Sequence, residues 1–288
     1  MKRFKPLLPL GSMTLIERCV ALFREAGVDI VRVVVGHRAE EVIPLLECRR
    51  VPWTLNTRFS EGMLSSVKAG LTDLPVDMPL VRQLTVLELL SACKTGGADV
   101  WYPCFGGKRG HPPLIATKYR SALLAWEGDG GLRAFLKDMK PHTVSVHVAD
   151  EHVLLDLDAP EHYKEALAGL PNYDIPSAEE CLVILKKQFQ VPPQLLEQAH
   201  RTVQLSLELG RDTDGYDHIF NIKLAIAVTL FRCLTNGWSS SDTATIVRNQ
   251  GFPRVADILD SSKEIITVSG LARSLYELVG GTEKLAPR

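Results

Sequence analysis

The sequence predicts an α/β domain with a mostly parallel sheet, followed by a separate all-α domain. Three observations support this prediction. In residues 1–170, short β-branched or aromatic runs alternate with amphipathic helical patterns, which is typical of right-handed βαβ units. At residues 170–176, two prolines and several polar residues interrupt this periodicity and predict a linker. Beyond the linker the apolar spacing is helical. The predicted domains cover residues 1–170 and 175–288.

The first domain is expected to begin with a helix. Thr14 and Glu17 form a capping-box pattern ahead of an amphipathic stretch, and Gly27 is placed to end that helix. The β-branched run 30–35 then predicts a strand that is buried on both faces. Further helices are expected at 40–46, 63–69, 85–94 and 161–168, and further strands at 53–56, 100–102, 143–148 and 153–157.

In the second domain, every segment with regularly spaced apolar residues is expected to be a helix. Ser177 and Glu180 form another capping-box pattern at its start. Helical spacing of apolar residues then covers 182–189, 193–209, 219–234, 241–249 and 268–279.

The composition excludes several classes of protein. The 33 basic and 34 acidic side chains balance, so no excess charge indicates nucleic acid or a membrane surface as a partner. Apolar runs are too short to span a bilayer, and the apolar stretch after the basic N-terminus is too short for a signal peptide. The six cysteines lack metal-binding spacing and are expected to be reduced, mostly buried thiols. These features predict a cytoplasmic protein.

Two acidic turns form the candidate metal site. Asp77 and Asp158 each follow apolar residues, and a proline stands two positions later, at Pro79 and Pro160. Open α/β sheets bind ligands at the carboxyl ends of their strands, and Mg²⁺ prefers oxygen ligands. The sequence therefore predicts that Asp77 and Asp158 share one Mg²⁺ over a phosphate-binding cleft. The alternative is that each aspartate caps a turn or the following helix.

Six short segments resemble, in order, motifs of the molybdenum-cofactor nucleotidyltransferases, which are relatives of the sugar-nucleotide pyrophosphorylases. The segments are 3–11, 59–70, 75–81, 107–112, 128–133 and 156–161. The resemblance implies a Rossmann-like domain of the nucleotide-diphospho-sugar transferase type. It also implies Mg²⁺-dependent transfer of a nucleoside monophosphate from CTP or GTP to a molybdopterin-type cofactor, with release of pyrophosphate. A molybdoenzyme or its chaperone is a further partner that the resemblance implies.

The resemblance also implies roles for individual residues, in addition to the metal-binding and catalytic aspartates. Lys5 would neutralise the triphosphate; the alternative is an ordinary solvated lysine. Ser65 and Ser66 stand where a helix is expected to begin and would bind a phosphate or a base edge, with helix capping as the alternative. Arg109 and His111 would clamp the acceptor's phosphate, unless their loop is shaped merely by its glycines.

The sequence departs from the family pattern in two places. The family opens with a buried strand and a glycine-rich loop that cradles the nucleotide phosphates, and residue 1 falls where that loop ends. In addition, few apolar residues precede the turn at Asp77, so a second central strand is expected to be missing. Two interpretations stay open: the true start lies upstream, or the chain is a catalytically inactive, nucleotide-binding or regulatory relative.

The helical domain resembles the HD phosphohydrolase domain that is sometimes fused behind this transferase. His200 matches the first metal-binding histidine of that domain. Phe231 and Arg232 replace its His-Asp pair, and Ser262 stands where a further histidine is expected. A single histidine cannot hold a dinuclear metal centre. A degenerate, catalytically silent HD domain is therefore predicted, and metal-dependent phosphohydrolase activity is the third alternative for the whole chain.

Overall fold

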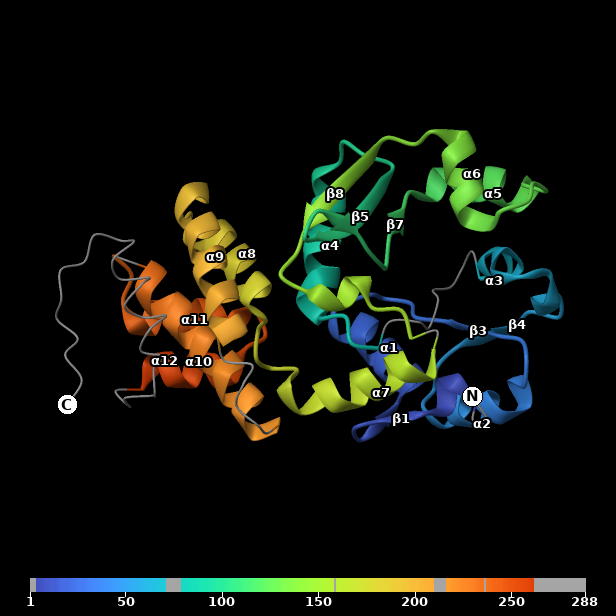
Figure 1. Ribbon diagram of the computed structural model, residues 1–288. Coiled ribbons are helices and arrows are strands. Elements are labelled where there is room, and N and C mark those ends of the chain that lie inside the picture. The colour runs from blue at the N-terminus through green and yellow to red at the C-terminus, as the bar shows by residue number, and fades with distance from the viewer. Residues whose placement is uncertain (1–3, 71–78, 158, 210–215, 236, 262–288) are drawn as a thin grey trace, which may run out of the picture. The chain divides into compact units, whose positions relative to one another are not determined.

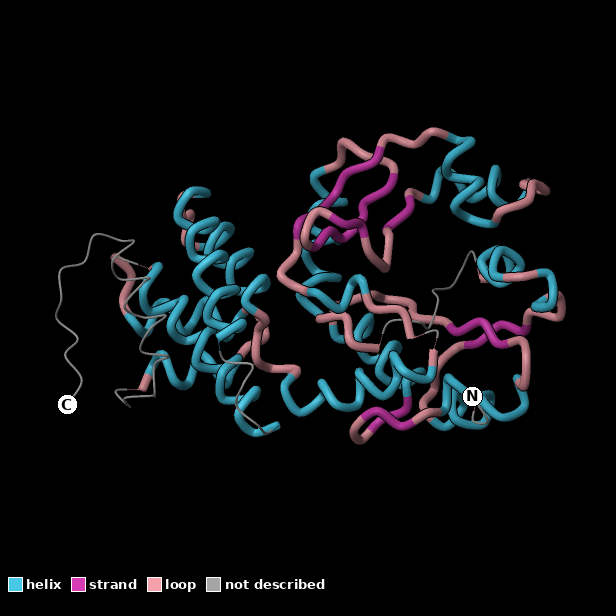
Figure 2. Tube along the Cα trace, in the orientation of Figure 1, coloured by secondary structure: helices cyan, strands magenta, loops and turns pink. Residues whose placement is uncertain are grey.

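A computed structural model describes residues 4–70, 79–157, 159–209, 216–235 and 237–261 of the 288-residue chain. The chain divides into two compact units, Met1–Leu170 and Pro171–Arg288. Strands occur in the first unit, and the described elements of the second are helices (Figure 2). No helix within the described ranges is long and apolar enough to cross a membrane.

The first half of unit 1 is organised by two parallel strands. β3 (Val33–Val35) pairs with β4 (Trp53–Leu55), and α2 (Ala39–Cys48) makes the crossover that parallel neighbours require (Figure 1). The predicted strand 30–35 is therefore too long at its start. Ile30 lies outside β3 and is 70% exposed, so this end of the run is not buried on either face.

Helix α1 (Leu15–Glu25) begins as the sequence predicts. The Glu17 carboxylate accepts a hydrogen bond from the Thr14 backbone N–H at 2.9 Å, and the Glu17 N–H donates to Thr14 Oγ1 at 3.4 Å. Leu15 and Ile16 are buried beneath this first turn. The capping box is thus confirmed, because both halves of the reciprocal pair form.

The remaining elements of unit 1 are short. Its other helices are α3 (Met63–Ala69), α4 (Gln83–Thr95), α5 (Arg120–Ala125), α6 (Gly131–Met139) and α7 (Pro160–Gly169). Its other strands are β1 (Pro9–Leu10), β2 (Met13–Thr14), β5 (Val100–Phe105), β6 (Lys108–Arg109), β7 (Leu114–Ile115) and β8 (Thr143–His147). Single 3₁₀ turns occur at Lys5–Leu7, Phe59–Glu61, Thr117–Tyr119, Glu151–Leu154 and Leu170–Asn172.

The sheet in the second half of unit 1 is mixed, so the prediction of a mostly parallel sheet is confirmed only in part: the longest pairings, β3–β4 and β5–β8, are parallel. β5 pairs with β8 in parallel and with β6 and β7 antiparallel. β6 follows β5 directly through the Gly106-Gly107 turn, where both residues have positive φ. A tight glycine turn of this kind reverses the chain and makes a hairpin. In the described residues, this sheet and the β3–β4 pair are separate.

The predicted strand 153–157 is also wrong. Glu151–Leu154 forms a 3₁₀ turn, because the Asp150 carboxylate accepts the His152 N–H at 3.1 Å and so caps the turn. The carbonyl of Val153 then accepts the His111 N–H at 2.8 Å, which ties this turn to the β6–β7 loop and not to a neighbouring strand.

A hydrophobic cluster connects α3 with the mixed sheet. Its buried members are Val100, Leu123, Phe135 and Leu136. Two side chains of α3, Leu64 and Val67, pack against it, as does Tyr102 of β5. This packing fixes α3 between the β3–β4 ends and the β5–β8 sheet.

Unit 2 consists of α8 (Ala178–Gln188), α9 (Pro193–Leu209), α10 (Tyr216–Leu234), α11 (Ser240–Asn249) and α12 (Pro253–Asp260). The predicted capping box at Ser177 and Glu180 is present. Helix α12 was not predicted, and the predicted helix 268–279 lies outside the described residues. All six cysteines are free, and four of them are buried, as expected for reduced core thiols.

Candidate functional site

Asn56 organises the carboxyl end of the β3–β4 pair. It directly follows β4, is 4% exposed, and donates its backbone N–H to the Val35 carbonyl at 2.8 Å. Its side-chain amide donates to Ser65 Oγ at 2.9 Å and to Ser66 Oγ at 3.1 Å. Its side-chain oxygen accepts the Arg58 N–H at 2.9 Å. One buried amide therefore holds both the loop after β4 and the start of α3.

The two predicted serines have different local roles. The hydroxyl of Ser65 lies 2.8 Å from the carbonyls of both Arg58 and Gly62, so its proton is used within the loop. The hydroxyl of Ser66 accepts a hydrogen bond from Asn56, and in the described part of the chain no acceptor is recorded for its proton. Ser66, and not Ser65, thus keeps a donor for a ligand.

An aromatic and basic cluster surrounds the end of β3. The ring of His37 lies 6.1 Å from the ring of Phe4 and 5.8 Å from that of Phe59, and the Arg38 guanidinium stacks 4.7 Å above Phe4. Lys5 follows Phe4 and is half-buried in the first 3₁₀ turn. The structure therefore places Lys5 next to the segment that ends β3, on the same side of the unit as Asn56.

Arg109 and His111 lie on the mixed sheet. The guanidinium of Arg109 stacks 4.8 Å from the Tyr102 ring and donates to Ser145 Oγ at 3.1 Å and to Thr143 Oγ1 at 3.0 Å. The side chain of His111 is exposed. Tyr102, on which Arg109 stacks, packs on the same hydrophobic cluster as Leu64 and Val67 of α3.

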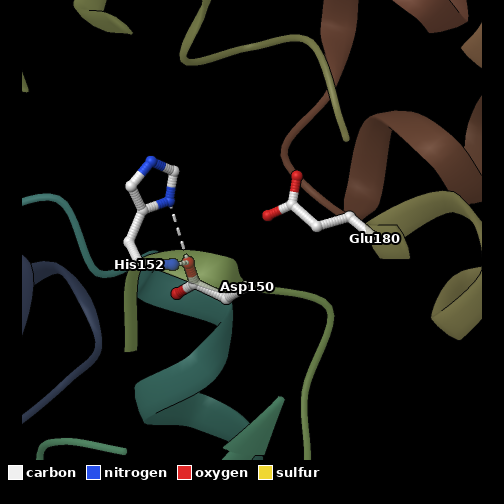
Figure 3. Close-up of side chains that lie close together, drawn as sticks. All are labelled: Asp150, His152 and Glu180. Carbon is white, nitrogen blue, oxygen red and sulfur yellow. Dashed lines mark hydrogen bonds and ion pairs between the residues drawn. The ribbon is translucent and has the colours of Figure 1, made fainter. Parts of the chain in front are cut away.

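A buried carboxylate, which the sequence analysis did not single out, lies after β8. Asp150 is 1% exposed, and its two oxygens accept hydrogen bonds from the Arg82 N–H (2.7 Å), the Thr85 hydroxyl (2.7 Å) and the backbone N–H and Nδ1 of His152 (both 3.1 Å). Figure 3 shows the His152 ring directed at this carboxylate. Burial opposes ionisation, but the hydrogen bonds and charge of His152 and Arg82 outweigh it, so the pKa of Asp150 is below its usual value.

Two predicted ligands cannot be placed. Asp77 and Asp158 lie outside the described residues. Their described neighbours are fixed: Val81 is 3% and Leu157 is 1% exposed. The carbonyl of Pro79 also accepts a hydrogen bond from Arg18 Nε of α1 at 3.1 Å. The predicted pairing of the two aspartates over one metal ion therefore stays a prediction.

The HD resemblance of unit 2 also stays a prediction. His200 lies in α9 and is half-buried. Phe231, at the position of the expected metal-binding histidine, is fully buried in α10, and its ring lies 6.3 Å from that of Phe189. An apolar ring packed at this position offers no metal ligand.

Asn56 and Asp150 are the two residues that the sequence analysis missed. Asn56 ends the predicted strand 53–56, and Asp150 follows the predicted strand 143–148 by two positions, so each is a polar residue near the carboxyl end of a predicted strand, as Asp77 and Asp158 are. Because polar residues after strands are also common in ordinary turns, their burial and partners were needed to distinguish them.

The described elements of the first unit form an α/β nucleotidyltransferase-like fold with a mixed sheet and many helices. Within this class, the chain belongs to the MobA-like NTP transferase domain family, whose model matches residues 1–144.

Individual relatives agree with this assignment. A protein named nicotine blue oxidoreductase, from Paenarthrobacter nicotinovorans, is 30% identical over 173 residues, which cover 54% of this chain and 84% of the relative. One similar solved structure is a homologue of Mycobacterium tuberculosis rv0371c from Mycobacterium sp. strain JC1, with a TM-score of 0.50 and 24% sequence identity. The match covers 60% of this chain and 90% of the homologue's chain. A second is a nucleotidyl transferase from Methanothermobacter thermautotroptrophicus, with a TM-score of 0.50 and 21% sequence identity. This match covers 58% of this chain and 85% of the transferase chain. These two structural likenesses show the fold.

Proposed function

We propose that the first unit transfers a nucleoside monophosphate from CTP or GTP to the phosphate of a molybdopterin-type cofactor. An oxygen of the acceptor's phosphate forms a bond to the α-phosphorus of the NTP. The bond from that phosphorus to the oxygen of the β-phosphate breaks, and pyrophosphate leaves with the electron pair. Since all reacting groups are anions, catalysis needs positioning and neutralisation of charge.

The observation that carries this proposal is the hydrogen-bonded arrangement of Asn56 and Ser66. Parallel α/β sheets bind ligands outside the carboxyl ends of their strands, and Asn56 holds Ser66 at such an end. The Asn56 side-chain amide donates a hydrogen bond to the Ser66 hydroxyl oxygen, so the hydroxyl proton of Ser66 points away from Asn56. We assign this proton to a phosphate oxygen or a base edge of the nucleotide, and we assign to Lys5 the neutralisation of the triphosphate.

On the mixed sheet, Arg109 is the candidate for binding the acceptor's phosphate. Its two hydrogen bonds to Thr143 and Ser145 and its stacking on Tyr102 restrict the guanidinium to one orientation, and that side chain is exposed. A fixed guanidinium binds phosphate with little loss of conformational entropy. His111, two residues on, would add a second donor.

Mg²⁺ suits the predicted carboxylate pair, because carboxylate oxygens are the ligands that Mg²⁺ prefers. Asp77 and Asp158 would hold the ion, which supplies positive charge to the α-phosphate.

The test is an assay for pyrophosphate with purified protein, molybdopterin, Mg²⁺ and each NTP in turn. We expect release with CTP or GTP and its loss in Asp77→Ala. Ser66→Ala is expected to weaken nucleotide binding about 10-fold, the effect of one hydrogen bond to a charged group. Ser65→Ala is the matched control, because its hydroxyl is used inside the loop, and it is expected to leave nucleotide affinity unchanged.

Two other results would replace this proposal. Binding of NTP by folded protein without pyrophosphate release would favour the catalytically inactive, regulatory alternative. The relative that is 30% identical carries the name of an oxidoreductase, which makes reduction the second candidate function. Oxidation of NADH or NADPH in the presence of nicotine blue, together with no pyrophosphate release, would support it.

A further inference from the structure

Gly110 lies in the β6–β7 loop, between the two residues that are assigned to the acceptor's phosphate. Arg109 and His111 are exposed, whereas Gly110 is buried. The N–H of Gly110 donates to the Pro103 carbonyl of β5 at 2.8 Å, and the N–H of His111 donates to the Val153 carbonyl at 2.8 Å. The backbone of this loop is therefore bonded both to β5 and to the 3₁₀ turn that follows β8.

The contact between Gly110 and Val153 leaves no room for a side chain. A Cβ atom at position 110 would lie 2.2 Å from the carbonyl oxygen of Val153, 2.7 Å from its carbonyl carbon and 2.9 Å from its Cβ. By contrast, Gly106 and Gly107 of the same hairpin have positive φ, and nothing lies within 4 Å of a Cβ built on either of them. Gly110 does not have a positive φ. A glycine is therefore required at this position by the close approach of two backbones and not by the backbone conformation.

The backbone of Val153 is held in place. Its side chain is 1% exposed. The Asp150 carboxylate, which is bonded to the first turn of α4, accepts the His152 N–H at 3.1 Å and so caps the turn that contains Val153. Before this turn, the Val148 N–H donates to the Cys104 carbonyl of β5 at 3.0 Å. Because the turn is fixed at these points, a side chain added to the glycine would displace the loop, by about 1 Å to reach an ordinary contact distance.

We propose that Gly110 is a positioning residue that holds Arg109 and His111 where they bind the acceptor's phosphate. This inference rests on the proposed function, and it assigns Gly110 no contact with the substrate. The missing side chain lets the loop lie against Val153, and the bond from the His111 N–H closes the same contact. Displacement of the loop would also stretch the two bonds from Arg109 to β8. A misplacement of about 1 Å is expected to lower affinity for the acceptor by about 10- to 100-fold.

The test measures the binding of molybdopterin and of CTP or GTP separately, by isothermal titration calorimetry. In Gly110→Ala, the affinity for molybdopterin is expected to fall by about 10- to 100-fold. The affinity for the nucleotide is expected to change by less than about twofold, because the residues assigned to it, Lys5 and Ser66, lie on other elements.

Gly27→Ala is the matched control. It adds the same methyl group at the end of α1, where the glycine has a φ of +78° and nothing lies within 4 Å of the added Cβ. The variant is expected to lower stability through its backbone conformation without displacing the loop. Its affinity for molybdopterin is expected to stay within about twofold of the wild-type value, which separates loss of stability from loss of positioning.

A double-mutant cycle shows whether Gly110 acts through its neighbours. In a protein that already carries Arg109→Gln and His111→Gln, Gly110→Ala is expected to change the affinity for molybdopterin by less than about twofold, because the side chains that the loop positions are gone. Equal losses in both backgrounds would mean that the glycine is merely structural, and would overturn the inference.

Hydrogen exchange of the wild-type protein tests the contact without any substitution. Because the His111 amide is bonded to the Val153 carbonyl, it is expected to exchange at least about 10-fold more slowly than an amide of an unstructured peptide, before molybdopterin is added. Exchange at the unstructured rate would overturn the inference, even where Gly110→Ala does not fold.

The outcomes separate the two proposals. If the wild-type protein and Arg109→Gln fail alike to bind molybdopterin, the assigned acceptor site and this inference are both overturned. If the wild-type protein binds it more tightly than Arg109→Gln does, and folded Gly110→Ala binds it as tightly as Gly27→Ala, the acceptor site stands and the positioning role is overturned. An equal loss of affinity for molybdopterin and for the nucleotide in Gly110→Ala overturns the positioning role as well.

Discussion

Asn56 and Asp150 are both buried polar residues shortly beyond the end of a parallel strand, yet they stabilise different levels of structure. Asn56 holds residues nine and ten positions away, in the first turn of α3. Asp150 holds residues 65 and 68 positions away, at the start of α4. A neutral amide is sufficient for the local loop. Where two distant segments meet in a dry environment, a carboxylate with four donors supplies the stronger, charge-assisted bonds.

The largest effect is expected from Asp150→Ala. The substitution leaves the Arg82 N–H and the Thr85 hydroxyl buried without their acceptor and removes a negative charge that lies 3.9 Å from Nε of the buried Arg82. Loss of one partner in such a buried network costs about 3–5 kcal/mol. Urea denaturation followed by circular dichroism is expected to show this fall in the free energy of unfolding. Asp99→Ala, at a partly exposed carboxylate, should cost less, and equal losses would contradict the comparison.

Acid is expected to weaken the Asp150 centre selectively. The pKa of Asp150 is lower in the folded protein than in the unfolded chain, so its contribution to stability is present at neutral pH and falls as the pH drops below about 4 towards the folded-state pKa. The stability difference between the wild-type protein and Asp150→Asn should therefore shrink on acidification. The difference between the wild-type protein and Asn56→Ala should stay constant, because an amide does not titrate. Parallel curves for both variants would show that folding does not lower the pKa of Asp150.

The smallest effect is expected from Asn56→Ala. The variant loses the donors to Ser65 and Ser66 and the acceptor for the Arg58 N–H. Because both serines are only partly buried and water can replace the amide, the expected cost is about 1–3 kcal/mol. Thermal unfolding measures this loss of stability. The nucleotide affinity of Asn56→Ala is expected to be reduced, as is that of Ser66→Ala. A loss as large as that of Asp150→Ala would remove the distinction between the two centres.

Much of the secondary structure was predictable because its signals are local. The capping boxes at Thr14 and Ser177 lie within one turn of the helices they start, and helical spacing predicted α2, α3, α4, α7 and most helices of unit 2. The segment 153–157 failed for a tertiary reason. Its apolar residues suit a strand, but capping by Asp150 and the bond from His111 to Val153 turn the chain instead.

The roles predicted for the candidate site residues stay predictions. The motifs led to Ser65, Ser66 and Arg109, and these residues have different partners in the structure. Ser65 donates to loop carbonyls and Ser66 accepts from Asn56, whereas Arg109 stacks on Tyr102 of the mixed sheet. Spacing in the sequence does not distinguish a hydroxyl that is used within a loop from one that still has a donor, because both serines are adjacent in the same motif. The positions of Asp77 and Asp158 relative to each other stay a prediction.

The sequence by itself determined where the two helices with capping boxes begin, the strands β3, β4, β5 and β8, and which family the first 144 residues resemble, since all of these depend on residues near one another along the chain. The tertiary structure decided that β8 pairs with β5 and gave Asp150 its role. The pairing of β5 with β8 depends on how about forty intervening residues return the chain, and the state of a buried carboxylate depends on donors that arrive from more than sixty residues away. Neither is written in a local pattern.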